Sequence, residues 1–161
     1  MNGRLPELGR WSNSTGFDDA TVLYAAAAHQ CFQQLQDAAS RLAAILLLMS
    51  FEKSRHALDH TTRESAIAQI AEGHEQYRSL KPTLRSAHFH RHLGAGLQLL
   101  HQCSNAIERT LAGATGATDP LPILTQGWKE LESASRCLPG FEVVDFSHSC
   151  CANHAPDQTR S

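Results

Sequence analysis

The stretch "TVLYAAAAHQCFQQLQDAASRLAAILLLM" (residues 21–49) contains the strongest pattern in the chain. Apolar or small residues recur along it at alternating steps of four and three, the spacing that places side chains on one face of an α-helix. Eight residues follow this rhythm: Tyr24, Ala28, Cys31, Leu35, Ala38, Leu42, Ile45 and Met49. The pattern predicts one long helix with a buried face. "FDDAT" before it offers Asp18, Asp19 or Thr21 as the cap.

Three further segments repeat the pattern. Thr61 and Glu64 in "TTRE" fit a capping box that opens a second helix, which must end near Pro82. Asp119 before Pro120 is typical of a helix start, and Pro139–Gly140 of a helix end. The predicted inner faces comprise Ile67, Ile70, His74 and Tyr77, then Leu93, Leu97, Leu100, Ser104, Ile107 and Leu111, then Leu124, Trp128, Leu131, Ser135 and Leu138.

Four helices with short connections predict an all-α fold, an antiparallel four-helix bundle with a long first helix. We expect the bundle over residues 18–138, preceded by an N-terminal arm (1–17) and followed by an irregular, extended C-terminal tail (139–161) that contains Cys and His. In that tail, "FEVVDF" (141–146) would pack its apolar side chains against the bundle. Gly94 and Gly96 are expected to allow a close approach between helices.

The composition excludes several classes of partner. A chain of 161 residues with a formal net charge of −2 has no electrostatic reason to bind nucleic acid or an acidic membrane surface. Its most apolar run, "LAAILLLMSF" (42–51), is shorter than the roughly 20 residues that span a bilayer. The polar start and the irregular spacing of the five cysteines predict reduced thiols and a cytoplasmic location.

No familiar catalytic or nucleotide-binding motif occurs in the sequence. It contains no G-x-x-x-x-G-K-[ST], G-x-G-x-x-G, G-x-S-x-G or C-x-x-C. A ferritin-like di-iron site is also excluded, because such sites need Glu-x-x-His pairs and none is present. The candidate functional residues are therefore the histidines and cysteines.

Two His-x-x-x-His pairs, His56/His60 and His88/His92, each place both rings on one helix face. A pair with this spacing can chelate zinc, nickel or copper. In a bundle whose first helix continues past Met49, the two pairs would lie some 20 Å or more apart, so no shared ion is expected. A solvated helix face is the simpler interpretation of either pair.

"HSCCANH" (148–154) packs two histidines and two cysteines into seven residues. So short a stretch seldom supplies all four ligands of a tetrahedral ion, so the bundle would have to contribute the remainder. Helix lengths put Cys137 level with the histidines near the start of the third helix. The predicted metal site, with zinc or another transition metal, draws on His74, His90, Cys137, His148, Cys150, Cys151 and His154. There are two alternatives: the tail has no function, or its two adjacent thiols form a redox-sensitive pair.

Two helix faces become polar at one end. Glu52, His56 and Asp59 would continue the first face, and Ser86 and His90 precede the third. These positions are either solvated or form a polar pocket or a partner surface.

The leading hypothesis is a small regulatory or adaptor protein that binds another protein or itself. The second is a transition-metal-binding or metal- or redox-sensing protein. The third is an enzyme whose histidines act as general acids and bases.

Overall fold

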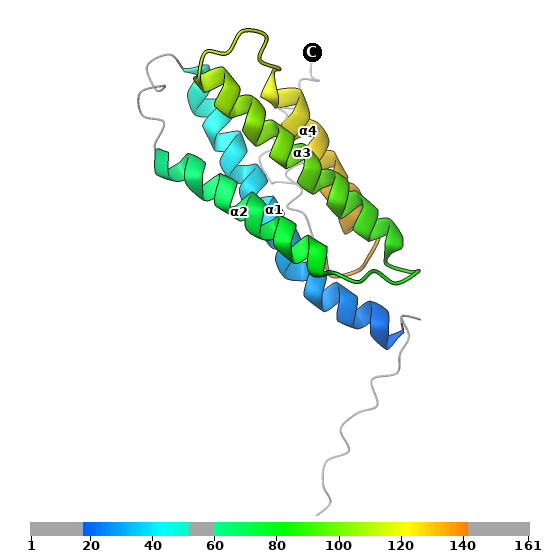
Figure 1. Cartoon of the computed structure of the whole chain (residues 1–161). Helices are drawn as coiled ribbons and strands as arrows, with labels where there is room; N and C mark the ends of the chain where they lie inside the picture. The colour runs from blue at the N-terminus through cyan, green and yellow to red at the C-terminus, as the bar shows by residue number, and fades with distance from the viewer. Residues whose placement is uncertain (1–17, 52–59, 142–161) are drawn as a thin grey trace, which may run out of the picture.

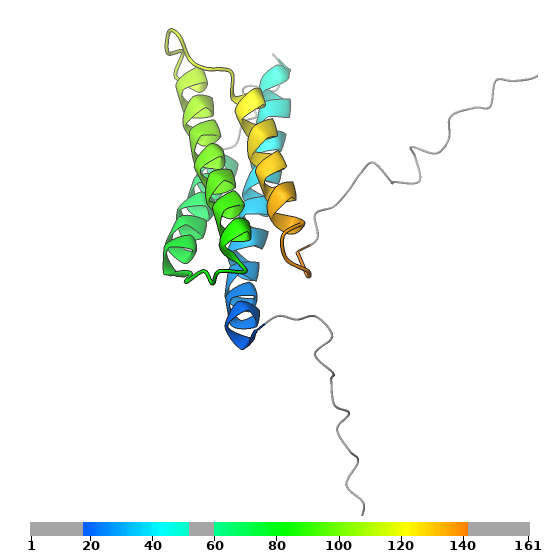
Figure 2. The ribbon, with the colours of Figure 1, turned by 90° about the vertical axis from the view of Figure 1, so that its right-hand side faces the viewer.

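The computed structural model describes residues 18–51 and 60–141. They form four helices, α1 (Asp19–Ser50), α2 (His60–Ser79), α3 (Ala87–Leu111) and α4 (Pro120–Ser135). No strand occurs in this part of the chain, so the predicted all-α bundle is confirmed. Consecutive helices alternate in direction (Figure 1), and α3 and α4 lie side by side (Figure 2). Both α1 and α3 contact all three other helices, whereas α2 and α4 do not touch.

The predicted face of α1 forms the centre of the core. Seven of its eight residues, Tyr24 to Ile45, are no more than 4% exposed, and Met49 packs against them at the end of the helix. Phe32 and Ala39 are buried as well, because α1 packs against three helices rather than one. The predicted continuation past Met49 is wrong, since Phe51 already has extended backbone. Glu52, His56 and Asp59 lie outside the described residues.

The predicted inner face of α2 is partly wrong. Ile67 is 44% exposed and His74 is exposed, whereas Ala66 and Gly73 are buried. A Cβ on Gly73 would lie 3.0 Å from Leu35 Cδ2, so the missing side chain lets α2 approach α1 closely. Small residues rather than the largest apolar ones therefore set the rotation of α2.

Side chains cap two of the helices as the sequence predicts. Asp18 accepts a hydrogen bond from the Thr21 amide at 2.7 Å, and Asp119 accepts one from the Leu121 amide at 3.0 Å. The prediction that Thr61 caps α2 is wrong, because the helix already includes His60 and Thr61 lies within it.

Two glycines lie at helix contacts of α3: Gly96 allows the predicted close approach to α4, and Gly94 leaves room for the Tyr77 ring of α2. A Cβ on Gly96 would lie 3.0 Å from Leu131 Cδ2 of α4, and one on Gly94 would collide with the Tyr77 hydroxyl of α2. The predicted α3 face is buried from Leu93 to Ile107, with Leu111 half-buried at its end.

Phe141 is the last residue that the structure describes, and its side chain closes the core. Its side chain is 5% exposed and its ring lies 5.2 Å from the Phe32 ring and 4.4 Å from the Phe89 ring, between centroids. The predicted packing of this residue is confirmed. Val143 and Phe146 lie outside the described residues. None of the described helices combines the length and apolar character needed to cross a membrane.

We predict that Leu42→Ala lowers the free energy of unfolding by about 2–5 kcal/mol, because Leu42 is 1% exposed and its truncation leaves a cavity in the core. Leu47→Ala on the same helix is the control. Leu47 is 61% exposed, so its truncation should change stability by less than about 0.5 kcal/mol. Urea unfolding of both variants measures the difference, and equal effects would contradict the burial of this face.

Candidate metal centre

One group of three metal-ligand side chains converges among residues 18–51 and 60–141. It consists of His88 and His92 on α3 and Cys137, which follows α4. One ligand atom from each residue lies within 4.8 Å of the other two. The Cys137 amide donates to the Ala134 carbonyl at 2.9 Å, so a turn that continues α4 holds the thiol beside α3.

The two histidines already have the separation that a metal ion requires. Their Nε2 atoms lie 3.3 Å apart, and their rings are almost perpendicular at 84°. With Zn–N bonds of about 2.0–2.1 Å and Zn–S bonds of about 2.3 Å, ligand atoms of a tetrahedral ion lie roughly 3.3–3.6 Å from one another. The nitrogen pair meets this distance, and the Cys137 side chain would have to turn its sulfur toward the pair to meet it as well.

Glu130 of α4 orients the His92 ring. Its Oε2 lies 2.7 Å from His92 Nδ1, and both side chains are about one-fifth exposed. This hydrogen bond is the main cause that holds the pKa of Glu130 below its ordinary value, so the carboxylate is ionised and the imidazole donates. Nδ1 therefore carries the proton, and the Nε2 lone pair faces His88 and Cys137. Metal-binding histidines are commonly held by such a carboxylate.

Arg91 sets the state of the His88 ring. Its guanidinium lies 2.9 Å from His88 Nδ1, and because a guanidinium only donates, Nδ1 must accept. The neutral ring then carries its proton on Nε2, which donates to His92 Nε2. Hydrogen bonds thus run from Arg91 through His88 and His92 to Glu130. Binding of a metal to His88 Nε2 would require that proton to move to Nδ1 and Arg91 to turn away.

Cys137 is a half-buried thiol. Its Sγ donates to the Ser133 carbonyl at 3.1 Å. Burial raises the pKa of the thiol, while the charge of Arg91 acts in the opposite direction. A metal ion would bind the thiolate, so it would have to displace the proton.

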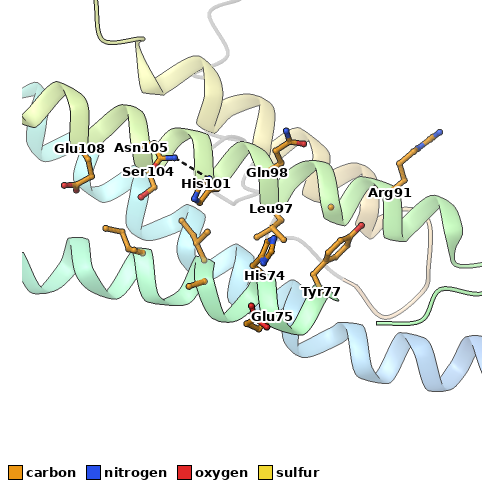
Figure 3. A pocket seen from close by; sticks show the side chains of 14 residues that line it. His74, Glu75, Tyr77, Arg91, Leu97, Gln98, His101, Ser104, Asn105 and Glu108 are labelled. Carbon is orange, nitrogen blue, oxygen red and sulfur yellow. Dashed lines mark hydrogen bonds between the residues drawn. The ribbon is translucent and has the colours of Figure 1, made fainter. Parts of the chain in front are cut away.

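The structure separates the other residues of the predicted site. His74 is exposed in a groove between α2 and α3 (Figure 3). His90 faces the opposite side of α3 from the cluster, where its Nδ1 lies 3.0 Å from the Tyr24 hydroxyl and its ring stacks on Tyr77 at 4.3 Å. Burial lowers the pKa of His90. His148, Cys150, Cys151 and His154 lie outside the described residues.

Sequence reasoning treated His88/His92 as a separate chelating pair and placed Cys137 at their level, but it did not join the three. It missed Glu130 and Arg91 altogether. The four-residue spacing, combined with the level of Cys137, was the signal that could have found the cluster. No signal in the sequence marks Glu130, whose role depends on the rotation of α4.

No protein family, curated protein or solved structure shows a detectable match to this chain.

We predict that Cys137 is alkylated by iodoacetamide in the folded protein at least about tenfold faster than Cys31 or Cys103. Burial raises the pKa of Cys31 to about 12 and that of Cys103 to about 11, and both thiols are inaccessible. Peptide mass spectrometry measures the three rates. Labelling after unfolding in guanidinium is the control and should remove the difference, whereas equal rates in the native protein would contradict the burial.

Proposed function

We propose that this protein binds one transition metal ion, with zinc as the best match, through His88, His92 and Cys137. The observation that supports this is the convergence of three ligand atoms, two from α3 and one from the turn that follows α4, within 4.8 Å. Two imidazoles and one thiolate suit zinc, which accepts nitrogen and sulfur donors in a tetrahedral arrangement. Copper and nickel are weaker matches, because their divalent ions favour square-planar or tetragonal sites.

Three protein ligands leave one position on a tetrahedral ion. We propose that Cys150 or Cys151 of the tail fills it. A fourth protein ligand would make the site a closed, structural one, and a cysteine thiolate is a usual ligand in such zinc sites. Phe141 holds the start of the tail in the core, and the nine residues from there to Cys150 can span about 30 Å when extended. Metal binding would then attach the tail to the bundle, which is a change that a partner could detect.

Metal binding by the full chain, purified without a histidine tag and stripped with a chelator, tests the proposal. Equilibrium dialysis followed by elemental analysis should give one zinc ion per chain. His92→Ala and Cys137→Ala should each weaken binding by more than about 100-fold, which exceeds the effect of losing a residue that only hydrogen-bonds to a ligand. His101→Ala is the control, because His101 is exposed on the same helix and lies outside the cluster. Unchanged affinity in the two ligand variants would refute the site.

The role of Glu130 gives a graded prediction. Glu130→Gln removes the charge that holds His92, so zinc affinity should fall about 10–100-fold while the stoichiometry stays at one. Glu132→Gln changes a neighbouring carboxylate that lies outside the cluster and should leave the affinity unchanged. Equal effects of the two variants would mean that Glu130 acts only through the general field of the protein.

The fourth ligand is identified with cobalt in place of zinc. Each thiolate adds to the sulfur-to-cobalt charge-transfer absorption, so Cys150→Ser/Cys151→Ser should reduce this band without abolishing it. An unchanged band would assign the fourth position to water and leave the three-residue site intact.

A regulatory or adaptor role that acts through self-association is the second candidate. Leu23 and Leu84 are 71% and 96% exposed, and a 2.8 Å contact between the Thr21 and Thr83 hydroxyls ties their segments together. Apolar side chains exposed together in one patch mark protein contacts, and we propose that these two leucines belong to such a patch. We predict that the mass of the protein in solution rises with concentration and that Leu23→Ser/Leu84→Ser restores the monomer, as measured by sedimentation. A wild-type protein that stays monomeric would contradict this candidate.

A further inference from the structure

The α2 and α3 helices enclose a groove with a volume of about 770 Å³ (Figure 3). The two helices meet at its ends. At one end the Tyr77 ring lies against Gly94, and its hydroxyl donates to the His90 carbonyl at 3.2 Å. At the other end the Arg63 guanidinium binds the Glu108 carboxylate through two hydrogen bonds, of 2.9 and 2.6 Å. Contact at both ends holds the helices apart over the length between them.

The lining of the groove is mainly apolar, with one buried serine. Ile67, Ile70, Ala71 and Leu97 supply the apolar surface. Ser104 is only 6% exposed and lies on the side of α3 that faces α2 (Figure 3).

Ser104 differs from the other buried polar residues of the described chain. Thr21 and Ser86 both have hydroxyl partners, whereas the Ser104 hydroxyl has no hydrogen bond with any described residue. The Ser104 oxygen itself is not fully buried, so it can be reached from the groove, where water or a ligand can supply the hydrogen bond. The hydroxyl therefore marks a position where a bound molecule would gain a hydrogen bond.

The charged groups around the groove already have partners. Glu108 binds Arg63, Glu75 lies 3.5 Å from Arg78, and Arg91 donates to His88. The two carboxylates are thus paired, and the Arg91 guanidinium points away from α2 and out of the groove (Figure 3). An ionic occupant would therefore have no charged partner, while an uncharged one would lose nothing.

We propose that the groove binds a slender, uncharged organic molecule with an apolar body and a hydrogen-bond acceptor directed at Ser104. The volume falls within the range of about 300–1,000 Å³ that small-molecule sites occupy, and a few polar groups in an apolar lining are typical of them. The closed ends favour a small molecule over a partner helix, which would have to pass Tyr77 or the Arg63–Glu108 pair.

Nile red is a suitable probe, because it is flat and uncharged and carries a carbonyl acceptor. Titration of the full chain should show saturable fluorescence enhancement with one dye per chain. Ala71→Phe fills the groove and should weaken binding at least about tenfold. Ser104→Ala should weaken it about fivefold, as expected for one hydrogen bond. Ala44→Phe adds the same ring to an exposed position of α1 outside the groove and should change nothing.

Ile67→Phe provides a second groove variant if Ala71→Phe fails to fold, since Ile67 is 44% exposed. Dye affinity that is unchanged in both groove variants would overturn the proposal. So would self-association of the wild-type protein that Ala71→Phe abolishes, because the groove would then be an interface between copies. Zinc stoichiometry, measured in the same variants, should stay at the wild-type value, which separates failure of this site from failure of the metal centre.

Discussion

The close approach of α3 and α4 is the constraint on which the candidate metal centre depends. Where the helices cross, Gly96 faces Leu131, and a Cβ on Gly127 would lie 3.3 Å from the Leu99 Cβ. A Cβ at either glycine would force the leucine side chains beside it to give way by a few tenths of an ångström. Because the ligand atoms of the cluster lie within 4.8 Å of one another, a wider spacing of the two helices would carry Cys137 farther from the histidines. Two positions without side chains thus contribute to the spacing that this chemistry requires.

The same principle explains why the bundle is asymmetric. Gly73 lets α2 pack tightly on α1, as the glycines of α3 and α4 do for those helices. Between α2 and α3, by contrast, Tyr77 and the Arg63–Glu108 pair act as spacers. The protein is therefore two tight helix pairs joined more loosely along one side. The loose side carries the groove and the α3–α4 pair carries the metal ligands, so the two candidate sites follow from one distribution of small residues.

The sequence predicts the faces of α1 and α3 because their apolar residues are large and regularly spaced. It fails for α2, where Ala66 and Gly73 decide the packing and carry no apolar signal. The candidate site shows a related limit. Helix lengths predict that Cys137 lies at the same height along the bundle as the α3 histidines. Height alone does not determine which of these histidines point toward Cys137. At about 100° per residue, His90 lies roughly 200° around the helix from His88, so one ion cannot bind both. That step follows from the sequence, whereas the contribution of Glu130 needs the rotation of α4.

Arg91 connects the two sites. It lines the groove and also donates to His88 Nδ1, and its guanidinium points away from α2 (Figure 3). An ion on His88 Nε2 would move the ring proton to Nδ1, and two donors would then face each other. Arg91 would have to leave His88, and its charge already acts on two other groups of the cluster region. It adds to the His92 hydrogen bond that lowers the pKa of Glu130, and it opposes the burial that raises the pKa of Cys137. The residue that must release His88 therefore also favours the anionic forms of the two side chains that would hold and support the ion.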